Sequence, residues 1–413
     1  MSYRIRRRHI VASLTLFILL AVLCGIGVFR HTGKQQLDQR LADLRDQGYP
    51  TTLDDLEALH RIPEGADNAA PLYLQAIAMY FGSTLDLPTL NKQLPLKVEA
   101  LHPSDEQLIQ ELLTDHEDVL ILLHAAAEIE HCEYPPDPES RFSVIFKHLI
   151  DVQKLVLLLS VQAHWSADQN EPTAAYESLR ASVALTQSLD APLLINHLAM
   201  NQREMDVIRG MQRVLNRIAF TEPQLVSLSK SILPWVKSDG LAQPMAAERC
   251  FTLIPLQQKI TGSFVLSLRS WLGLLPRDIV KYIDLAQKGI EIANLPSHLQ
   301  LGEAQTLATA SQNHSNPLLN RVGTHGSGFI QRNLVTVTHA RLAVTALAIE
   351  RYKLAHGNLP TTLDVLSPQY MPSIPLDPFD GLPLKYEKRS NGFTVYSVGP
   401  DQAKEISLVI GRI

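Results

Sequence analysis

The chain has 413 residues, of which 46% are hydrophobic, and a formal net charge of -5 at pH 7. A chain of this length and composition can bury a sizeable core, and its length predicts two or three domains. No basic patch lies beyond the first eight residues, which argues against nucleic acid as a partner.

Residues 1–31 have the pattern of a membrane anchor. Four arginines lie between residues 4 and 8, and an uncharged apolar run follows from Ile10 to Phe29. A run of about 20 apolar residues is long enough to cross a bilayer as a helix. Because positive charge before a span favours the cytoplasmic side, we expect a single-pass protein of a bacterial inner membrane. Its amino terminus would be cytoplasmic and the bulk of the chain periplasmic.

Two alternatives to a retained anchor involve cleavage near the end of this run. A signal peptidase would use the small residues of Gly25-Ile26-Gly27, although the apolar run continues through Val28 and Phe29. A lipoprotein signal would end at Cys24, where the bulky Leu23 stands in place of the expected small residue. A retained anchor fits the pattern better than either alternative.

Residues 32–311 predict a large helical domain, bundle or solenoid-like, with surfaces for protein partners. Apolar residues recur at helical spacing, and strand-like alternation is nearly absent. Residues 156–167 and 174–185 resemble one tetratricopeptide-type helix pair, but no repeat of about 34 residues recurs, so an ordinary helical hairpin is the favoured interpretation. The expected helices cover residues 37–47, 67–79, 105–130, 143–168, 172–188, 192–219, 222–237 and 244–287.

Histidines and cysteines in this domain are the first candidates for chemistry. His116, His124 and His131 are eight and seven residues apart, whereas helical metal sites usually use closer pairs. We therefore favour structural or solvated roles for them. Cys132 and Cys250 allow a disulfide outside the membrane, but two separate buried thiols are the simpler interpretation.

An apolar stripe over residues 264–275 has two interpretations. It predicts either a helix on the membrane surface or a helix packed into the core. Basic enrichment, which is typical of a surface helix, is missing, so core packing is favoured. The stripe consists of Phe264, Leu268, Trp271, Leu272 and Leu275.

Residues 312–332 are predicted to be a flexible connector. The glycine-rich run Gly323-Thr324-His325-Gly326-Ser327-Gly328 lacks the lysine of a phosphate-binding loop and has no strand before it.

A seven-residue segment occurs twice, at Pro50–Leu56 and Pro360–Leu366, and each copy follows a helix and a glycine. A glycine that ends one helix, a proline and a threonine that caps the next helix form a short junction between helices. The same requirements of the turn therefore explain the similarity of the two segments better than a duplication does. In the second copy we expect Thr361 to be the N-cap, with Asp364 in the first turn.

Residues 333–413 predict a small α+β module. A long helix should end at Gly357, a short helix should follow, and residues 384–387 and 393–397 should form an antiparallel hairpin across Asn391-Gly392. Tyr396 should face outward because side chains alternate along a strand. The expected core consists of Leu342, Ile349, Leu363, Leu366, Tyr370, Leu384, Tyr386, Phe393 and Val395.

Four motifs mark this module: Ala348–Tyr352, His356–Leu363, Ile374–Pro378 and Tyr396–Asp401. Together, over about residues 333–401, they resemble the C-terminal region of type II secretion system major pseudopilins. The resemblance implies a link to a secretion or pilus-like envelope assembly. It also implies a calcium site in the tail, for which Ser397 and Asp401 match the family pattern, whereas residues 402–404 depart from it. No other cofactor is expected.

The sequence therefore predicts a mainly α protein with an N-terminal transmembrane helix, a large helical domain and a small α+β tail. We expect an extracytoplasmic binding or scaffold protein. The alternative is a hydrolase or transferase whose site is hidden in the helical domain, although no nucleophile elbow marks one. A deep pocket with convergent polar side chains would support the enzyme, whereas a shallow concave helical face would support a surface for a protein partner.

Overall fold

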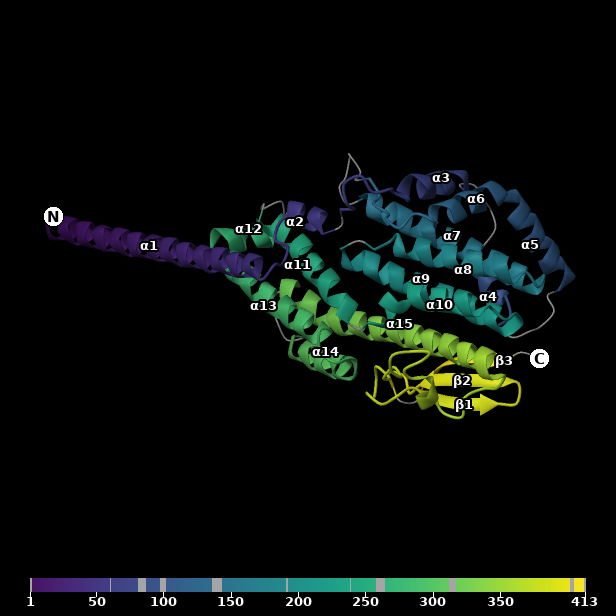
Figure 1. Ribbon diagram of the computed structural model, residues 1–413. Helices are drawn as coiled ribbons and strands as arrows, with labels where there is room; N and C mark the ends of the chain where they lie inside the picture. Colours follow the sequence, from purple (N-terminus) through teal and green to yellow (C-terminus); the bar gives the residue numbers. More distant parts are fainter. Residues whose placement is uncertain are drawn as a thin grey trace.

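The computed structural model shows a body of packed helices, one helix that projects from it, and a small antiparallel sheet along one side (Figure 1). This confirms the predicted mainly α fold with an α+β tail. Side chains are not described for residues 2–13, 143–148, 257, 264–266 and 317–325. The structure describes residues 2–59, 61–80, 87–96, 102–135, 143–190, 192–237, 239–257, 264–311, 317–401 and 405–411.

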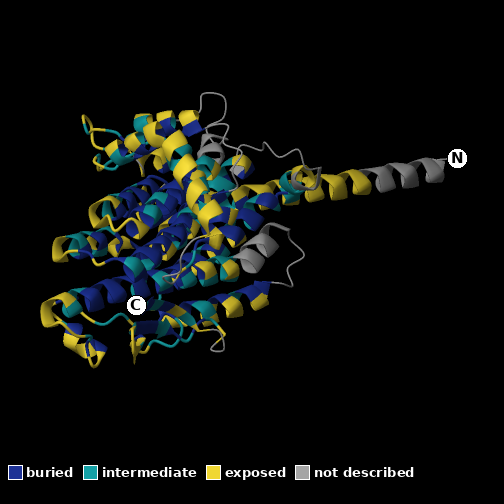
Figure 2. Cartoon of the chain, turned by 90° about the vertical axis from the view of Figure 1, so that its right-hand side faces the viewer, coloured by how far each residue is buried: buried dark blue, intermediate teal, exposed yellow. Residues whose placement is uncertain are grey.

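Helix α1 (Ser2–Asp46) has two parts with different surroundings. From Leu14 to Phe29 its large apolar side chains are exposed, except for the partly buried Ile26, and this part projects alone from the body (Figures 1 and 2). Farther on, Leu37, Leu41 and Leu44 are buried in one cluster with side chains of α13. The helix is long and apolar enough to cross a membrane.

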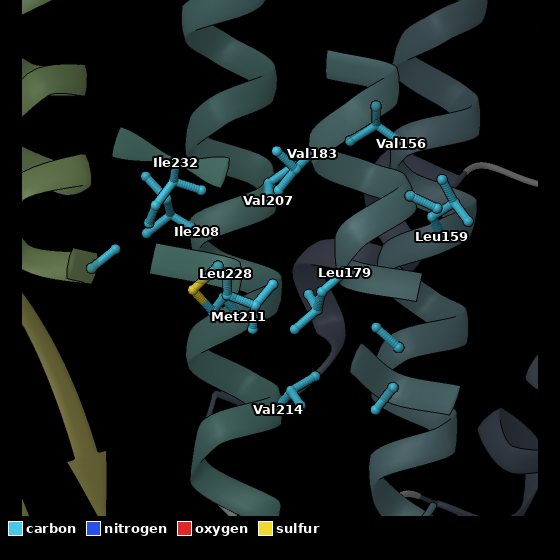
Figure 3. Close-up of a cluster of buried hydrophobic side chains, with 14 of the residues drawn as sticks. Val156, Leu159, Leu179, Val183, Val207, Ile208, Met211, Val214, Leu228 and Ile232 are labelled. Carbon is cyan, nitrogen blue, oxygen red and sulfur yellow. The ribbon is translucent and has the colours of Figure 1, made fainter. Parts of the chain in front are cut away.

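Three long helices form the centre of the body: α7 (Ser143–Asp168), α8 (Pro172–Gln187) and α9 (Leu194–Arg217). The α7–α8 pair confirms the predicted helical hairpin, and Asn170 turns the chain between them at a φ of 59°. Figure 3 shows how the apolar side chains of these helices and of α10 point toward one another.

The other elements of this half surround that centre. Its helices are α3 (Ala70–Tyr80), α4 (Leu87–Gln93), α5 (Pro103–Asp115), α6 (Glu117–Ala126), α10 (Glu222–Ser231) and the 3-10 helix η1 (Leu233–Val236). The short helix α2 (Leu53–Ala58) packs instead with the second group of helices, described next. The single helix expected over 105–130 is wrong. The chain leaves helical geometry at His116, whose φ and ψ are -116° and 21°, and α5 ends there.

The second group of helices packs nearer to α1. It comprises the 3-10 helix η2 (Asp239–Leu241), α11 (Ala242–Gln257), α12 (Phe264–Trp271), α13 (Leu275–Ala293) and α14 (Ser297–Ser311). The long helix expected over 244–287 is therefore three helices. Gly273 separates α12 from α13 at a φ of 75°, a conformation that glycine adopts without steric cost.

Helix α15 (Pro317–His356) corrects the predicted connector. Residues 317–332 are its first turns, whereas residues 312–316 lie outside the described part of the chain. Each glycine disfavours a helix by about 1 kcal/mol relative to alanine. Ile330 and Leu334, however, are buried in one cluster with Ile292 of α13 and Ala304 of α14. This burial offsets the low helix propensity of the glycines.

The tail carries a three-stranded antiparallel sheet, β1 (Lys385–Arg389), β2 (Gly392–Ser397) and β3 (Ile406–Gly411), in the order β1-β2-β3. The predicted hairpin is confirmed, with Tyr386 opposite Val395. Strand β3 was not predicted. It makes β2 the central strand, and its other edge meets α9, where Gln212 donates a 3.0 Å hydrogen bond to the carbonyl of Val409.

The sheet, the end of α15 and helices α3 to α10 share one apolar core. The boundary expected at residue 333 therefore falls inside α15 and does not divide the packing. Of the expected core residues, Tyr386 is partly buried and the others are buried. Tyr396, expected on the outer face, is also partly buried.

The two copies of the repeated segment begin alike but form different helices. Thr52 caps α2 in a capping box: its hydroxyl accepts from the Asp55 amide at 3.2 Å, and the Asp55 carboxylate accepts from the Thr52 amide at 2.9 Å. In the second copy Val365 replaces that aspartate, and the 3-10 helix η3 (Leu363–Leu366) has no side-chain cap. The N-cap is Thr362, so the prediction of Thr361 is wrong.

We expect Ile349→Ala to lower the free energy of unfolding by about 2–5 kcal/mol, because this side chain is fully buried in α15. Leu354→Ala on the same helix removes a half-exposed side chain and should cost less than about 1 kcal/mol. Urea unfolding of the full chain in detergent, followed by circular dichroism, measures both. Equal losses in the two variants would contradict the described packing of α15.

Candidate functional site

A cavity of about 880 Å³ lies in the helical body. Its lining comes from the stretch between α2 and α3 with Tyr73 of α3, from the segment that follows α6, from the end of α8, from the first half of α9, from the stretch between η1 and the start of α11, and from α15. Both apolar side chains, such as Met200 and Trp235, and polar ones line it. We call it the Glu204 cavity, after the most deeply buried carboxyl in its wall.

Helix α9 supplies a polar stripe to this wall, formed by His197, Asn201 and Glu204. Their spacing of four and then three residues places them on one helical face. Asn333 of α15 meets the stripe: its Oδ1 accepts from His197 Nε2 at 2.9 Å and from Asn201 Nδ2 at 3.4 Å. Burial lowers the pKa of His197, partly offset by this hydrogen bond to Asn333. We therefore assign the neutral imidazole, with its proton on Nε2.

Glu204 differs from its neighbours on the stripe because its carboxyl has no hydrogen-bond partner among the residues that the structure describes. The residue is 3% exposed. Burial, and then the charge of Asp190, raise the pKa of its carboxyl to about 8. The group is therefore protonated at neutral pH and carries an unused donor and acceptor toward the cavity.

A second group of polar side chains surrounds Cys132, which lines the cavity together with Ser188. The hydroxyls of Tyr134 and Ser188 lie 3.0 Å apart, and both hydrogen-bond to the Cys132 thiol. Burial nonetheless raises the pKa of that thiol to about 12, so it stays neutral. The Ser188 hydroxyl also donates to the carbonyl of Leu185 at 2.7 Å. These groups are arranged for hydrogen bonding rather than for nucleophilic attack.

The predicted calcium candidates lie in the tail, far along the chain from this cavity. Ser397 is buried, and its hydroxyl donates to Asp377 at 2.9 Å, while the amide of Val398 donates to the same carboxylate at 2.8 Å. This network ties the Pro-Leu-Asp-Pro bend to the end of β2. Asp401 is exposed in a turn, and residues 402–404 lie outside the described residues. A calcium ion at Ser397 and Asp401 remains a prediction.

The three predicted histidines are not brought together. His116 Nδ1 lies 2.9 Å from the carbonyl of Leu112, and His124 Nε2 lies 2.9 Å from Gln162 Oε1. His131 lines the Glu204 cavity. Among the described residues, no group of three or more histidine, cysteine, aspartate or glutamate side chains is placed to hold a metal ion.

Cys132 and Cys250, the two cysteines beyond the apolar run, are both unpaired; Cys250 is buried as expected, whereas Cys132 is only partly buried. Cys132 lines the cavity, whereas Cys250 is buried in a separate cluster around Leu56 and Ala247.

The polar stripe of α9 was not predicted from the sequence. One signal was present: His197, Asn201 and Glu204 recur at helical spacing within the helix predicted over residues 192–219. The contribution of Asn333 had no local signal, because it lies 136 residues from its partner His197. Comparisons with protein-family profiles, characterised proteins and solved structures found no match to the chain.

We expect Glu204 to make stability depend on pH. Burial raises the pKa of its carboxyl from 4.5 to about 8, so between these pH values the folded chain retains a proton that the unfolded chain releases. Stability is therefore lost as the pH rises from 4.5 to about 8. The loss from this group is at most on the order of 5 kcal/mol.

Glu204→Gln should remove this loss and be more stable than the wild type at pH 8, whereas Glu303→Gln, at an exposed site, should keep the wild-type profile. Urea unfolding over a pH series measures the difference. Parallel profiles for wild type and Glu204→Gln would contradict a neutral, buried Glu204.

Proposed function

We propose that this protein is a membrane-anchored binding protein that takes a small organic ligand into the Glu204 cavity. The observation that carries the proposal is the Glu204 carboxyl, which is buried, faces a cavity of about 880 Å³ and lacks a hydrogen-bond partner among the described residues. Buried polar groups in folded proteins are normally paired. Ligand pockets commonly have about 300–1,000 Å³, with apolar walls and a few directed polar groups.

The charges around Glu204 favour a ligand with a basic nitrogen. Asp190 is the charged group that acts on the Glu204 carboxyl, and it raises the pKa. A protonated amine beside Glu204 would reverse this effect: it would favour the ionised carboxylate and form a charge-assisted hydrogen bond with it. Met200 and Trp235 would contact the apolar body of such a ligand.

An enzyme that uses the same cavity is the second candidate. Binding is favoured over catalysis because the possible nucleophiles beside the cavity, the Cys132 thiol and the Ser188 hydroxyl, are not activated. The Cys132 thiol is kept neutral with a pKa of about 12, and the Ser188 hydroxyl donates to a backbone carbonyl.

Matched probes test the binding proposal. We expect 2-phenylethylamine to bind the full chain in nanodiscs and Glu204→Gln to weaken it by about tenfold or more, since hydrogen bonds to charged groups contribute about 1.5–3 kcal/mol. The neutral 2-phenylethanol should bind both forms equally. Saturation-transfer NMR measures both probes. Equal amine binding by wild type and Glu204→Gln would contradict the choice of a basic ligand.

A second pair of variants tests the location. Ala184→Phe on α8 places a ring in the cavity wall and should abolish binding of both probes. Ala174→Phe makes the same change at an exposed position of the same helix and should leave binding unchanged. Unchanged binding by Ala184→Phe would place the probe site elsewhere.

The anchor of this proposed protein is α1, with its amino end in the cytoplasm of a bacterium and the body in the periplasm. The support is the arginine-rich start, the apolar run and the exposure of that run along the projecting helix. Alkaline phosphatase fused to the C-terminal end should be active, and the chain should stay in membranes washed with carbonate. Activity of a cytoplasmic reporter instead would reverse the orientation.

The pseudopilin resemblance supports a role for this binding protein beside a secretion or pilus-like assembly. Its support is limited to the tail, where the end of α15, the Pro-rich bend and the β1–β2 hairpin follow one another in the order that the resemblance implies.

A further inference from the structure

The turn between α12 and α13 touches α1 where its apolar run ends. Gly273 lies so close to α1 that a side chain there would meet Arg30 Cγ at 2.5 Å. Gly273 is therefore required both by its positive φ and by this close approach. The contact places the end of α12 beside the point where α1 leaves the body (Figure 1).

Arg277, in the first turn of α13, fixes this contact. Its guanidinium lies 3.6 Å from the centroid of the Phe29 ring. It also donates to the carbonyl of Phe29 at 2.7 Å and to the hydroxyl of Thr32 at 2.8 Å. Phe29 is the last residue of the apolar run. The turn between α12 and α13 is thus fixed beside the end of the apolar run of α1. If α1 spans a membrane, this is the level at which the hydrocarbon core would end.

Helix α12 presents an apolar face that the body does not cover. Leu268 is 45% exposed and Trp271 is 57% exposed, and their spacing of three residues places them on one side of the helix. The core packing favoured from the sequence is therefore wrong for these two residues, although it is correct for Leu275, which is buried. The side chain of Phe264 lies outside the described part.

The charged residue of α12 is turned toward the protein. Arg269 forms a two-pronged ion pair with Asp278 of α13, at 2.6 and 2.9 Å. Among the described side chains of α12, the exposed ones are those of Ser267, Leu268 and Trp271, so none of them carries a charge.

We infer that α12 lies on the surface of the membrane that α1 spans, with Leu268 and Trp271 inserted into the boundary between headgroups and acyl chains. Trp271 is two residues from Gly273, a reach of about 7 Å along the chain, so its depth is set by the Gly273–Arg30 contact. Tryptophan is enriched at this boundary because its ring is apolar and its N–H is polar. Arg30 and Arg277 lie at the level of the headgroups. The inference rests on the proposed anchoring by α1.

Two attachment points have a mechanical consequence. A single helix leaves the body free to rotate about it, whereas a second contact beside it fixes which side of the body faces the bilayer. The inferred partner of the exposed face of α12 is a lipid surface, because this face lies beside the end of the apolar run of α1. The alternative partner for this face is a second copy of the chain.

Fluorescence quenching by brominated lipids tests the inference on the full chain in liposomes. Trp235 is buried and Trp165 is partly buried, so subtracting the spectrum of Trp271→Phe from that of the wild type isolates Trp271. We expect lipids brominated near the carbonyl to remove most of the Trp271 emission. Lipids brominated near the terminal methyl should remove less, and aqueous acrylamide should have little effect.

Three other results would overturn the inference, each in a distinct way. Loss of emission to acrylamide but not to brominated lipid would leave α12 in water. Protection from both quenchers would indicate a protein occupant such as a second copy. In both cases flotation of the chain with the liposomes would keep the α1 anchor intact. Failure of the wild-type chain to float would remove the anchor and this inference together.

Discussion

The arrangement of the body depends on the burial of α15 on every side. From Leu342 to Glu350 each residue of this helix is buried, so no face of it remains for solvent. A helix that is apolar all round needs a covering layer on each side. Helices α9 and α10 and strands β2 and β3 pack against α15, whereas α13 and α14 pack against its earlier turns around Ile330 and Leu334. The small sheet therefore belongs to the same core as the helical body, and neither layer is complete without the other (Figure 1).

Helix α9 lies in this core although many of its side chains are polar. In its second half the polar side chains bind neighbouring elements. Gln212 and Asn216 form hydrogen bonds with β3, and Arg213 donates a hydrogen bond to Asn91 of α4. Its first half has the same polar character but meets the Glu204 cavity. Because a buried carboxyl without a partner is costly, this stretch contributes less to stability than the second half does. That contrast along one helix is the physical basis for the proposed site.

The same contrast between covered and uncovered surface separates α1 from the body. Most of its apolar side chains from Leu14 to Phe29 are exposed, and beyond that point Leu37, Leu41 and Leu44 are buried against other helices (Figure 2). The change falls within about two turns of helix, at the place where Arg277 and Gly273 meet α1. Because α1 is continuous across this point, the direction of its apolar part is fixed relative to the body.

The sequence by itself determined the features that depend on local spacing: the apolar run, the helical character of the body, the α7–α8 pair and the β1–β2 hairpin. Tertiary structure decided the rest. The glycines at 323–328 predict a connector, but packing of Ile330 and Leu334 makes that stretch helical. Strand β3 needs β2 as its partner, and the polar stripe of α9 needs Asn333, which is 136 residues away from His197. The raised pKa of Glu204 depends on burial, which no local pattern encodes, because desolvation is produced by all the elements that surround the group.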